Sequence, residues 1–227
     1  MSDQTLSPAS APLTQRPVAL VTGASRGLGF AIASALGAEG WHVMAVARTS
    51  GGLEELDDRI QQAGGAASLA PMDITDAKAM EHLAQSVDTR WGGIGLWVHA
   101  AIHAAPLAPA GHLDMKDFDK SMACNLRATA LLIPLIEPLL RAENGTALFL
   151  DDPRGGEKFF GAYGATKAAQ IALARSWQAE CAKIGPRVLI ETPRPMATAT
   201  RGRFHPGEDR STLVDIHEEA RRLIGLL

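Results

Sequence analysis

Cysteine is scarce in this chain, and its scarcity argues against two classes of small protein. Only Cys124 and Cys181 occur among 227 residues, far apart and without the spacing of metal ligands. The pattern predicts reduced thiols that pack within helices, rather than a disulfide scaffold or a zinc module. We therefore expect a cytoplasmic protein with no bound metal.

Basic excess and long apolar runs are also missing. The formal net charge is -3, which offers no footprint for a polyanion, so nucleic acid is not an expected partner. No apolar stretch reaches the ~18–20 residues that cross a bilayer, and the N-terminus has no signal-peptide pattern, so no membrane association is expected. Residues 1–16, rich in Ser, Pro, Ala and Thr, are predicted to be a disordered leader before one domain at 17–227.

The remaining composition is that of a globular domain. Hydrophobic residues make up 46% and charged residues 21% of the chain, enough for a substantial core. Apolar runs alternate with helical patterns, which predicts an α/β fold with a doubly wound parallel sheet in a three-layer α/β/α arrangement, as a single domain. The expected strands are Val18–Val21, Trp41–Ala47, Ala66–Met72, Ile94–Ala101, Thr146–Leu150 and Arg187–Glu191. The expected helices are Phe30–Gly40, Gly51–Ala63, Asp76–Trp91, two pieces within Asp114–Arg141, one beginning near Gly161, and Leu213–Leu227.

A glycine-rich turn joins the first expected strand to the first expected helix. It reads Thr22-Gly23-Ala-Ser25-Arg26-Gly27-Leu28-Gly29. Gly23 permits a sharp turn, Gly27 lets a pyrophosphate approach the backbone, and Gly29 lets the helix pack closely on the strand. The N–H groups and the positive dipole end of the helix would hold the phosphates. The turn therefore predicts a dinucleotide cofactor.

The end of the second strand bears on which dinucleotide binds. Sites for NAD usually place an Asp or Glu about 20 residues past the glycines, on the ribose 2′-hydroxyl. Here the strand ends at Arg48, and Ser25 and Arg26 lie in the turn. A guanidinium matches a 2′-phosphate in charge and in forked geometry, so NADP (NADPH) is predicted in preference to NAD. The alternative is that Arg48 is a solvated strand end.

The helix near Gly161 carries Tyr163 and Lys167, four residues apart. This spacing places the phenol and the ammonium on one face of the helix. A cation there should favour phenolate and lower the pKa of Tyr163 from its ordinary value of about 10. Such a phenol can exchange a proton with a carbonyl or alcohol oxygen. Taken alone, the pair also fits a half-buried tyrosine beside a solvated lysine.

In combination, these motifs resemble the short-chain dehydrogenase/reductase family. The resemblance covers nearly everything from Pro17 onwards and rests on the Thr22–Gly29 turn, Asp73, Asn125, the Tyr163-x-x-x-Lys167 pair and Thr198. It implies a Rossmann fold, an NAD(P) cofactor, and hydride exchange between the nicotinamide C4 and a carbonyl or alcohol carbon of a small molecule. It also implies a homodimer or homotetramer that pairs through two long helices, here Asp117–Arg141 and Ala162–Ile184.

The resemblance assigns roles to individual residues as well. Tyr163 would be the general acid/base, and Lys167 would hold the nicotinamide ribose and bias the phenol. Asn125 would anchor a water that relays protons through Lys167. Asp73 and Ile74 would flank the adenine, and Thr198 would bind the carboxamide. The full set of implied cofactor contacts is Thr22, Gly23, Ser25, Arg26, Gly27, Leu28, Gly29, Arg48, Asp73, Ile74, Ala100, Tyr163, Lys167 and Thr198.

The chain departs from the family pattern after the fourth and fifth strands. The usual Asn-Ala-Gly reads His99-Ala100-Ala101, and we favour His99 as a structural substitute for the Asn over a catalytic histidine. No Ser or Thr lies between Ala147 and Tyr163, so Asp152 takes the position of the family's catalytic Ser. An ionised Asp152 would only accept hydrogen bonds and would oppose ionisation of the phenol. A protonated one could donate as the Ser does. A third possibility is a loop residue paired with Arg154, outside the chemistry.

The segment after the sixth strand is unusual too. It reads Pro193-Arg194-Pro195, where the family has Pro-Gly, and Arg194 could bind an acidic substrate or a phosphate, or point to solvent. The short stretch beyond Thr198 predicts a small lid over an open pocket. Its arginines favour a polar or anionic ligand. The expected substrate contacts are Met196, Arg201, Arg203, Phe204 and His205, with Phe159 and Phe160 as apolar walls.

The sequence thus leaves two main hypotheses of different class. The first is an NADP-dependent oxidoreductase that exchanges hydride with a small carbonyl or alcohol through Tyr163 and Lys167, with Asp152 as an altered third member. The second is a catalytically impaired NADP(H)-binding protein that acts as a sensor or structural partner. A reductase of heteroaromatic C=N bonds fits the same scaffold, but nothing in the sequence selects it.

Overall fold

One parallel sheet organises the chain. The computed structural model describes residues 16–227, so the expected leader lies outside the described residues except for Arg16. The strands follow the spatial order β3-β2-β1-β4-β5-β6, and every neighbouring pair is parallel. Their bounds are β1 (Val18–Thr22), β2 (His42–Ala47), β3 (Ala66–Pro71), β4 (Leu96–His99), β5 (Thr146–Leu150) and β6 (Arg187–Glu191). The predicted doubly wound sheet is confirmed.

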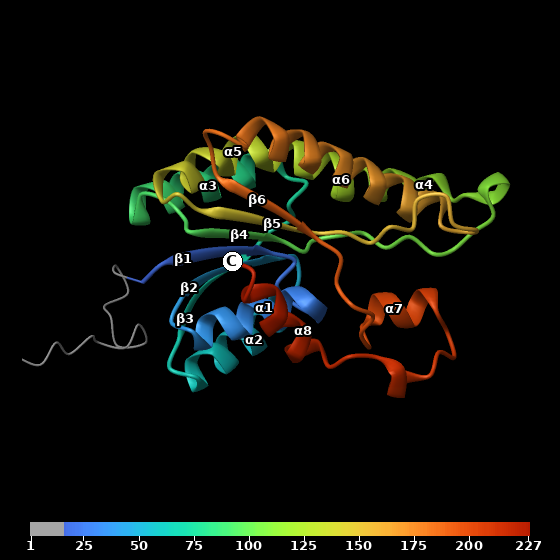
Figure 1. Cartoon of the computed structure of the whole chain (residues 1–227), viewed down its shortest axis with the longest axis horizontal. Coiled ribbons are helices and arrows are strands. Elements are labelled where there is room, and N and C mark those ends of the chain that lie inside the picture. The colour runs from blue at the N-terminus through green and yellow to red at the C-terminus, as the bar shows by residue number, and fades with distance from the viewer. Residues whose placement is uncertain (1–15) are drawn as a thin grey trace, which may run out of the picture.

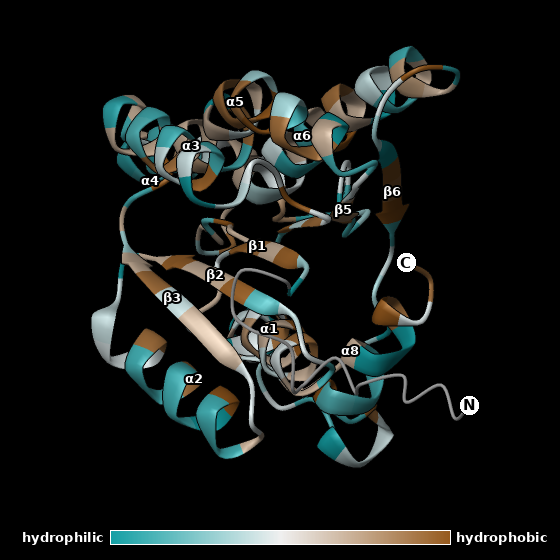
Figure 2. Ribbon diagram, turned by 90° about the vertical axis from the view of Figure 1, so that its left-hand side faces the viewer, coloured by the Kyte–Doolittle hydropathy of each residue, from teal (hydrophilic) through white to brown (hydrophobic). Residues whose placement is uncertain are grey.

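Helices cover both faces of this sheet (Figures 1 and 2). One layer contains α3 (Ala77–Trp91), α4 (Met115–Ser121), α5 (Ala128–Ala142) and α6 (Gly161–Cys181). The opposite layer contains α1 (Gly27–Ala38), α2 (Ser50–Gln62) and α8 (Ile216–Ile224). The short helix α7 (Ala199–Phe204) lies beyond the ends of the strands. This is the three-layer α/β/α arrangement that the alternation of elements predicts.

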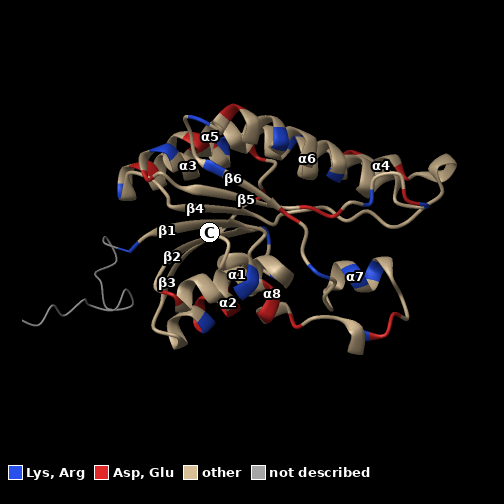
Figure 3. Cartoon of the chain, in the orientation of Figure 1, with Lys and Arg blue, Asp and Glu red and all other residues tan. Residues whose placement is uncertain are grey.

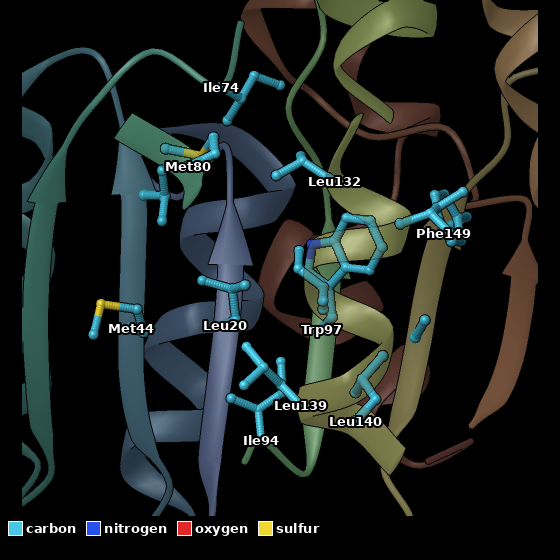
Figure 4. Close-up of a cluster of buried hydrophobic side chains, with 14 of the residues drawn as sticks. Leu20, Met44, Ile74, Met80, Ile94, Trp97, Leu132, Leu139, Leu140 and Phe149 are labelled. Atoms are coloured by element: carbon cyan, nitrogen blue, oxygen red, sulfur yellow. The ribbon is translucent and has the colours of Figure 1, made fainter. Parts of the chain in front are cut away.

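Each face of the sheet has its own hydrophobic core. Because β1, β2 and β4 are buried along their whole length, their sequences read as continuous apolar runs. On the α3/α5/α6 face, Trp97 of β4 lies fully buried beside Phe149 of β5, with ring centroids 5.3 Å apart in an edge-on arrangement (Figure 4). On the other face, α1, α2 and α8 pack on the sheet through Leu36, Leu56 and Leu223.

The region Asp114–Arg141 is two helical pieces, as predicted, but a π-helical segment at Met122–Arg127 joins α4 to α5. Asn125 lies in that segment. The continuous stretch Met115–Ala142 is also long and apolar enough to cross a membrane by length and composition alone, contrary to the expectation of no such run. Its apolar composition has a local explanation, since residues such as Leu132, Ile136 and Leu140 are buried against the sheet.

Some boundaries differ from the predictions. Strand β4 ends at His99, two residues before its expected end, and α1 begins at Gly27, inside the glycine turn. Helix α7 was not expected, because its six residues are too few to show a helical period. It begins where the Thr198 hydroxyl accepts a hydrogen bond from the Arg201 backbone N–H at 3.1 Å, which is an N-cap.

Candidate active site

The strand order reverses between β1 and β4, and in such sheets the crevice beyond the strand ends is the usual ligand site. A cavity of about 760 Å³ lies there and extends from the glycine turn to α7. Every predicted cofactor contact except Thr22 lines this cavity. Of the predicted catalytic residues, Tyr163, Lys167 and Asp152 line it, whereas Asn125 does not.

The glycine turn has the geometry that a dinucleotide requires. Gly23 has φ +83°, and a Cβ there would lie 2.6 Å from the Ala101 backbone nitrogen. A Cβ on Gly29 would collide with the Gly23 carbonyl oxygen, so this glycine permits the close packing of α1 on β1. Gly27 has φ +60° and faces open space, which leaves its backbone accessible to a ligand. The turn therefore fits a pyrophosphate at the start of α1.

Arg48 lines the cavity with a largely exposed side chain. The side chain is 62% exposed, and its Nη1 lies 3.9 Å from a carboxylate oxygen of Asp73. The other Asp73 oxygen accepts hydrogen bonds from the backbone N–H and the hydroxyl of Thr75, at 2.9 and 2.8 Å. Because an exposed ion pair at this distance is weak, Arg48 can turn towards a phosphate at small cost.

Tyr163 lies at the other end of the cavity, and its hydroxyl donates a hydrogen bond to Asp152 Oδ2 at 3.0 Å. Burial raises the pKa of Tyr163 well above its ordinary value, and the negative charge and hydrogen bond of Asp152 raise it further. Arg154 has a smaller, opposing effect. The sequence-based expectation of a lowered Tyr163 pKa is therefore wrong for the chain as described. The reasons are that the phenol is buried and that its hydroxyl donates a hydrogen bond to a carboxylate.

Asp152 combines two of the roles considered for it. One carboxylate oxygen accepts from Tyr163, and the other accepts from Arg154 Nε at 3.0 Å. Arg154 also donates to both oxygens of Glu157, at 3.1 Å each. Both of its carboxylate oxygens accept from donors of the chain, so the geometry supports an acceptor rather than a donor. Asp152 is thus a paired loop residue that also contacts the predicted general acid/base.

An aromatic cluster supports the Tyr163 ring. Phe204 of α7 lies 4.9 Å from it between ring centroids, and Phe160 lies 5.0 Å from Phe204. Phe160 is buried behind these rings, and Phe159 is 43% exposed. Neither of these two phenylalanines lines the cavity, so their predicted role as apolar walls is wrong. All five expected lid contacts do line it: Met196, Arg201, Arg203, Phe204 and His205.

Lys167 is a buried lysine rather than a solvated one. Its side chain lies in the protein interior, and Nζ donates to Gln170 Oε1 at 2.7 Å. Burial lowers the pKa of Lys167 to about 8, against the opposing negative charges of Asp151 and Asp152. The ammonium can therefore lose its proton within the working pH range of most enzymes.

Asn125 anchors backbone rather than facing the cavity. Its amide group bonds both ways with the main chain of His103: Oδ1 accepts from the N–H at 2.7 Å, and Nδ2 donates to the carbonyl at 3.0 Å. Nδ2 also donates to the hydroxyl of Thr166 on α6, at 3.0 Å. The Asn125 main-chain carbonyl accepts from the Thr129 hydroxyl at 2.9 Å. Asn125 thus fixes the segment after β4 and joins it to the catalytic helix.

His99 fills the structural role that the sequence favours for it. Its Nδ1 lies 2.8 Å from the Thr22 hydroxyl, and its Nε2 lies 3.0 Å from the Thr129 hydroxyl. Burial, with a smaller effect from Lys167, lowers the pKa of His99 to about 3, so its ring is neutral. Thr22 is fully buried in this contact. It does not line the cavity, and its hydroxyl joins two neighbouring strands.

The arginines after β6 are mostly neutralised within the chain. Arg194 Nε donates to Glu219 Oε2 at 2.6 Å, which removes Arg194 as a candidate for binding an anionic ligand. Arg201 Nε donates to Glu208 Oε2, also at 2.6 Å. Arg203 donates to the Ala104 carbonyl at 2.6 Å, on the opposite side of the cavity. Basic residues on α7 are visible in Figure 3, but their partners reduce the predicted preference for anions.

Sequence reasoning missed two polar residues that this site uses, Thr129 and Gln170. Both are fully or almost fully buried on helices, at positions where an apolar side chain is the usual choice. Gln170 stands three residues after Lys167, on the same face of α6. That spacing was the available signal.

The chain is similar to known proteins over most of its length. The family described as short chain dehydrogenase matches residues 17–209. A fatty acyl-CoA reductase of Acinetobacter baylyi is 35% identical over 170 residues, which is 73% of this chain and 58% of that protein. A D-threitol dehydrogenase of Mycolicibacterium smegmatis is 35% identical over 131 residues, 58% of this chain and 50% of that protein. The chain thus spans only about half to three fifths of the length of these relatives.

Solved structures are similar over most of the chain. A short chain dehydrogenase structure from Pseudomonas syringae has a TM-score of 0.84 at 28% identity, covering 92% of this chain and 87% of that one. An alcohol dehydrogenase from Thermococcus sibiricus, in complex with 5-hydroxy-NADP, has a TM-score of 0.82 at 26% identity. That match covers 93% of this chain and 90% of the other.

Proposed function

The chain belongs to the short-chain dehydrogenase family, and we propose that it is an NADP-dependent oxidoreductase that exchanges hydride with a small carbonyl or alcohol through Tyr163 and Lys167. The observation that carries this proposal is that one cavity holds a phosphate-type glycine turn, an exposed arginine, a buried phenol and a buried lysine. Family membership alone would support only the coarser statement that the chain is an oxidoreductase with a nicotinamide cofactor.

The residues present fit the cofactor at both ends. The Gly23–Gly29 turn would receive the pyrophosphate, and Arg48 would pair with a 2′-phosphate. Thr198 and Lys167 line the part of the cavity where the nicotinamide end would lie. When bound, the cofactor supplies or accepts the hydride. The structural relative with bound 5-hydroxy-NADP supports, but does not by itself assign, the preference for NADP.

In this proposal Tyr163 works mainly as a proton donor. Its raised pKa keeps the phenol protonated near neutral pH, which is the form that can donate to a carbonyl oxygen. On substrate binding its O–H turns from Asp152 to the carbonyl oxygen and gives up its proton as the alkoxide develops. The Lys167 ammonium stabilises the resulting phenolate, whereas Asp152 disfavours it and promotes reprotonation. Arg154 keeps Asp152 in place as the alternative acceptor.

The substrate class is proposed from the pocket and the relatives together. The cavity wall near Tyr163 combines Phe204 and Met196 with the polar groups of Arg203 and His205. The relatives named above act on a fatty acyl-CoA and on D-threitol, so their own substrates differ in size and polarity. We therefore propose a substrate that is a small carbonyl compound or alcohol and carries both apolar and polar groups, which this wall could contact.

The alternative function is an NADP(H)-binding protein without turnover. Its support is that Asp152 takes the position of the family's catalytic Ser and accepts from Tyr163, and that the usual Asn-Ala-Gly reads His99-Ala100-Ala101. The curated relatives are named as dehydrogenases and reductases, which favours the enzyme. The family tendency to oligomerise and the scarcity of cysteine lead us to propose, in addition, a cytoplasmic homodimer or homotetramer.

The experiment that tests the proposal is an oxidation assay of NADPH by the purified chain against a panel of aldehydes, ketones and quinones. We expect turnover of at least one class, and a loss of about 10²- to 10⁴-fold in kcat for Tyr163→Phe. NADPH binding, followed by fluorescence, should weaken far less than kcat in that variant. Tight NADPH binding with no turnover of any panel member, and no effect of Tyr163→Phe, would favour the alternative instead.

A further inference from the structure

A network of buried polar side chains connects Lys167 on α6 to His99 at the end of β4. Lys167 Nζ donates to Gln170 Oε1 at 2.7 Å, and Gln170 Nε2 donates to the Thr129 hydroxyl at 3.0 Å. The Thr129 hydroxyl also meets His99 Nε2 at 3.0 Å and the Asn125 carbonyl at 2.9 Å. No residue in this series is more than 3% exposed: Lys167, Gln170, Thr129 and His99. Elements far apart in sequence are thereby joined at one point.

The hydrogen bonds around Gln170 have a defined direction. Thr129 donates its hydroxyl proton to the Asn125 carbonyl, so its oxygen accepts from Gln170 Nε2. His99 Nε2 lies 3.0 Å from the same hydroxyl, and His99 Nδ1 lies 2.8 Å from the Thr22 hydroxyl. Gln170 then has its amide nitrogen directed at Thr129 and its carbonyl oxygen at Lys167. The orientation of the Gln170 amide is therefore set by its neighbours rather than by solvent.

We propose that Gln170 is a positioning residue, which holds the Lys167 ammonium at the catalytic face of α6 and ties it through Thr129 to His99. The inference deepens the proposed function, because it concerns the same lysine. Gln170 does not line the cavity, so it touches neither substrate nor cofactor and acts only through Lys167.

The physical reason is the cost of burying an ammonium group. An isolated buried lysine would lose its proton, and a hydrogen-bond acceptor favours the charged form. Asp151, Asp152 and Cys124 also face Lys167 and raise its pKa, and His99 is neutral. Gln170 is the acceptor that bonds directly to Nζ, and its own place is fixed by Thr129. It thus stabilises the charge and restricts its position together.

The test is a direct titration of the lysine in the intact chain, without turnover. Lysine labelled with ¹³C at Cε gives one signal per residue, the chain has six lysines, and Lys167→Met assigns the signal of interest. Gln170→Leu keeps the size but removes the acceptor, and should lower the Lys167 midpoint by about one pH unit. Gln170→Glu keeps an acceptor and adds a negative charge, and should raise the midpoint. A purely structural role would not move the two variants in opposite directions.

The matched control is Gln178→Leu. Gln178 lies on the same helix and donates to the Val188 carbonyl, so it is not part of the hydrogen-bond network that contains Gln170. We expect no change in the Lys167 midpoint in this variant. Equal midpoints in wild type, Gln170→Leu and Gln170→Glu would overturn the proposal.

Kinetics separate this proposal from the proposed function. If the chain turns over NADPH, Gln170→Leu should lower kcat about tenfold with KM little changed, and should move the alkaline limb of the kcat profile to lower pH. If the chain shows no turnover at all, the proposed function fails, while the titration still decides the role of Gln170. A Lys167 midpoint that shifts as expected in an inactive chain would therefore retain the positioning role alone.

Discussion

The two ends of the cavity are built by different means. The nucleotide end is formed by backbone: glycines whose missing side chains leave room, and the first turn of α1. The proposed catalytic end is formed by side chains from β4, the loop after β5, α5 and α6, and nearly every polar group there has a partner elsewhere in the chain. A backbone site depends on a local run of sequence. A side-chain site depends on which helices and strands meet.

The largest expected effect tests the backbone end. Gly29→Ala places a methyl group against the Gly23 carbonyl oxygen, so the turn must open. We expect a loss of about 3 kcal/mol in the free energy of unfolding and a loss of more than about 100-fold in NADPH affinity. Denaturant titration and fluorescence titration measure the two effects.

The matched variant is Gly27→Ala, at φ +60° in open space. It should cost only about 1 kcal/mol, because an Ala in the left-handed region is strained but meets no neighbour. If the two variants lose the same free energy of unfolding, close packing is not what the Gly29 position requires.

An intermediate effect is expected for Arg48→Gln, which tests whether the nucleotide end distinguishes the two cofactors. Removing the guanidinium should weaken NADPH binding about tenfold to thirtyfold, because a charge-assisted contact to the 2′-phosphate is lost. NADH binding should be unchanged. Arg175→Gln, another exposed arginine with a distant carboxylate partner, is the control and should leave both affinities intact. Equal losses for NADPH and NADH in Arg48→Gln would contradict the 2′-phosphate assignment.

The smallest effect concerns the side-chain end and its altered residue. Asp152→Ser removes the charge and the acceptor that hold the Tyr163 proton, so the pKa of Tyr163 should fall by about one unit, although burial still keeps it high. Tyr163 is the only tyrosine in the chain, so the ultraviolet absorbance of tyrosinate reports this residue alone.

The same pair changes the alkaline stability. Because the folded chain binds the Tyr163 proton more tightly than the unfolded chain, whose phenol has a pKa of about 10, stability is lost as the pH rises above that value. The total loss should be smaller in Asp152→Ser, because the difference between the folded and unfolded pKa is smaller. A tyrosinate signal identical in both proteins would mean that Asp152 does not control the phenol.

Most of the fold was readable in the sequence. Buried parallel strands are continuous apolar runs, and three glycines between a strand and a helix indicate the glycine turn. Helix α7 was not readable, because one turn and a half shows no period. The π-helical segment around Asn125 was not readable either, since its sequence is that of an ordinary helix.

The catalytic end was readable only in part. Tyr163 and Lys167 stand at helical spacing, so their shared face could be inferred. The direction of the Tyr163 pKa could not be fixed, because it depends on where the Asp152 carboxylate turns. The hydrogen bond from Gln170 to Thr129 joins two helices and residues 41 positions apart, and no local sequence pattern predicts such a contact.

The buried carboxylate of Glu219 has a consequence for the last helix of the chain. Glu219 accepts from the backbone N–H and the guanidinium of Arg194, and hydrogen bonds to Arg222 and Arg194 lower its pKa to about 2 although burial opposes the change. Arg194 sits between two prolines that line the cavity, Pro193 and Pro195. These two prolines of the cavity wall are thus connected to α8 through Arg194. Truncating or tagging the carboxyl terminus would therefore change the affinity for a ligand, although no residue of α8 lines the cavity.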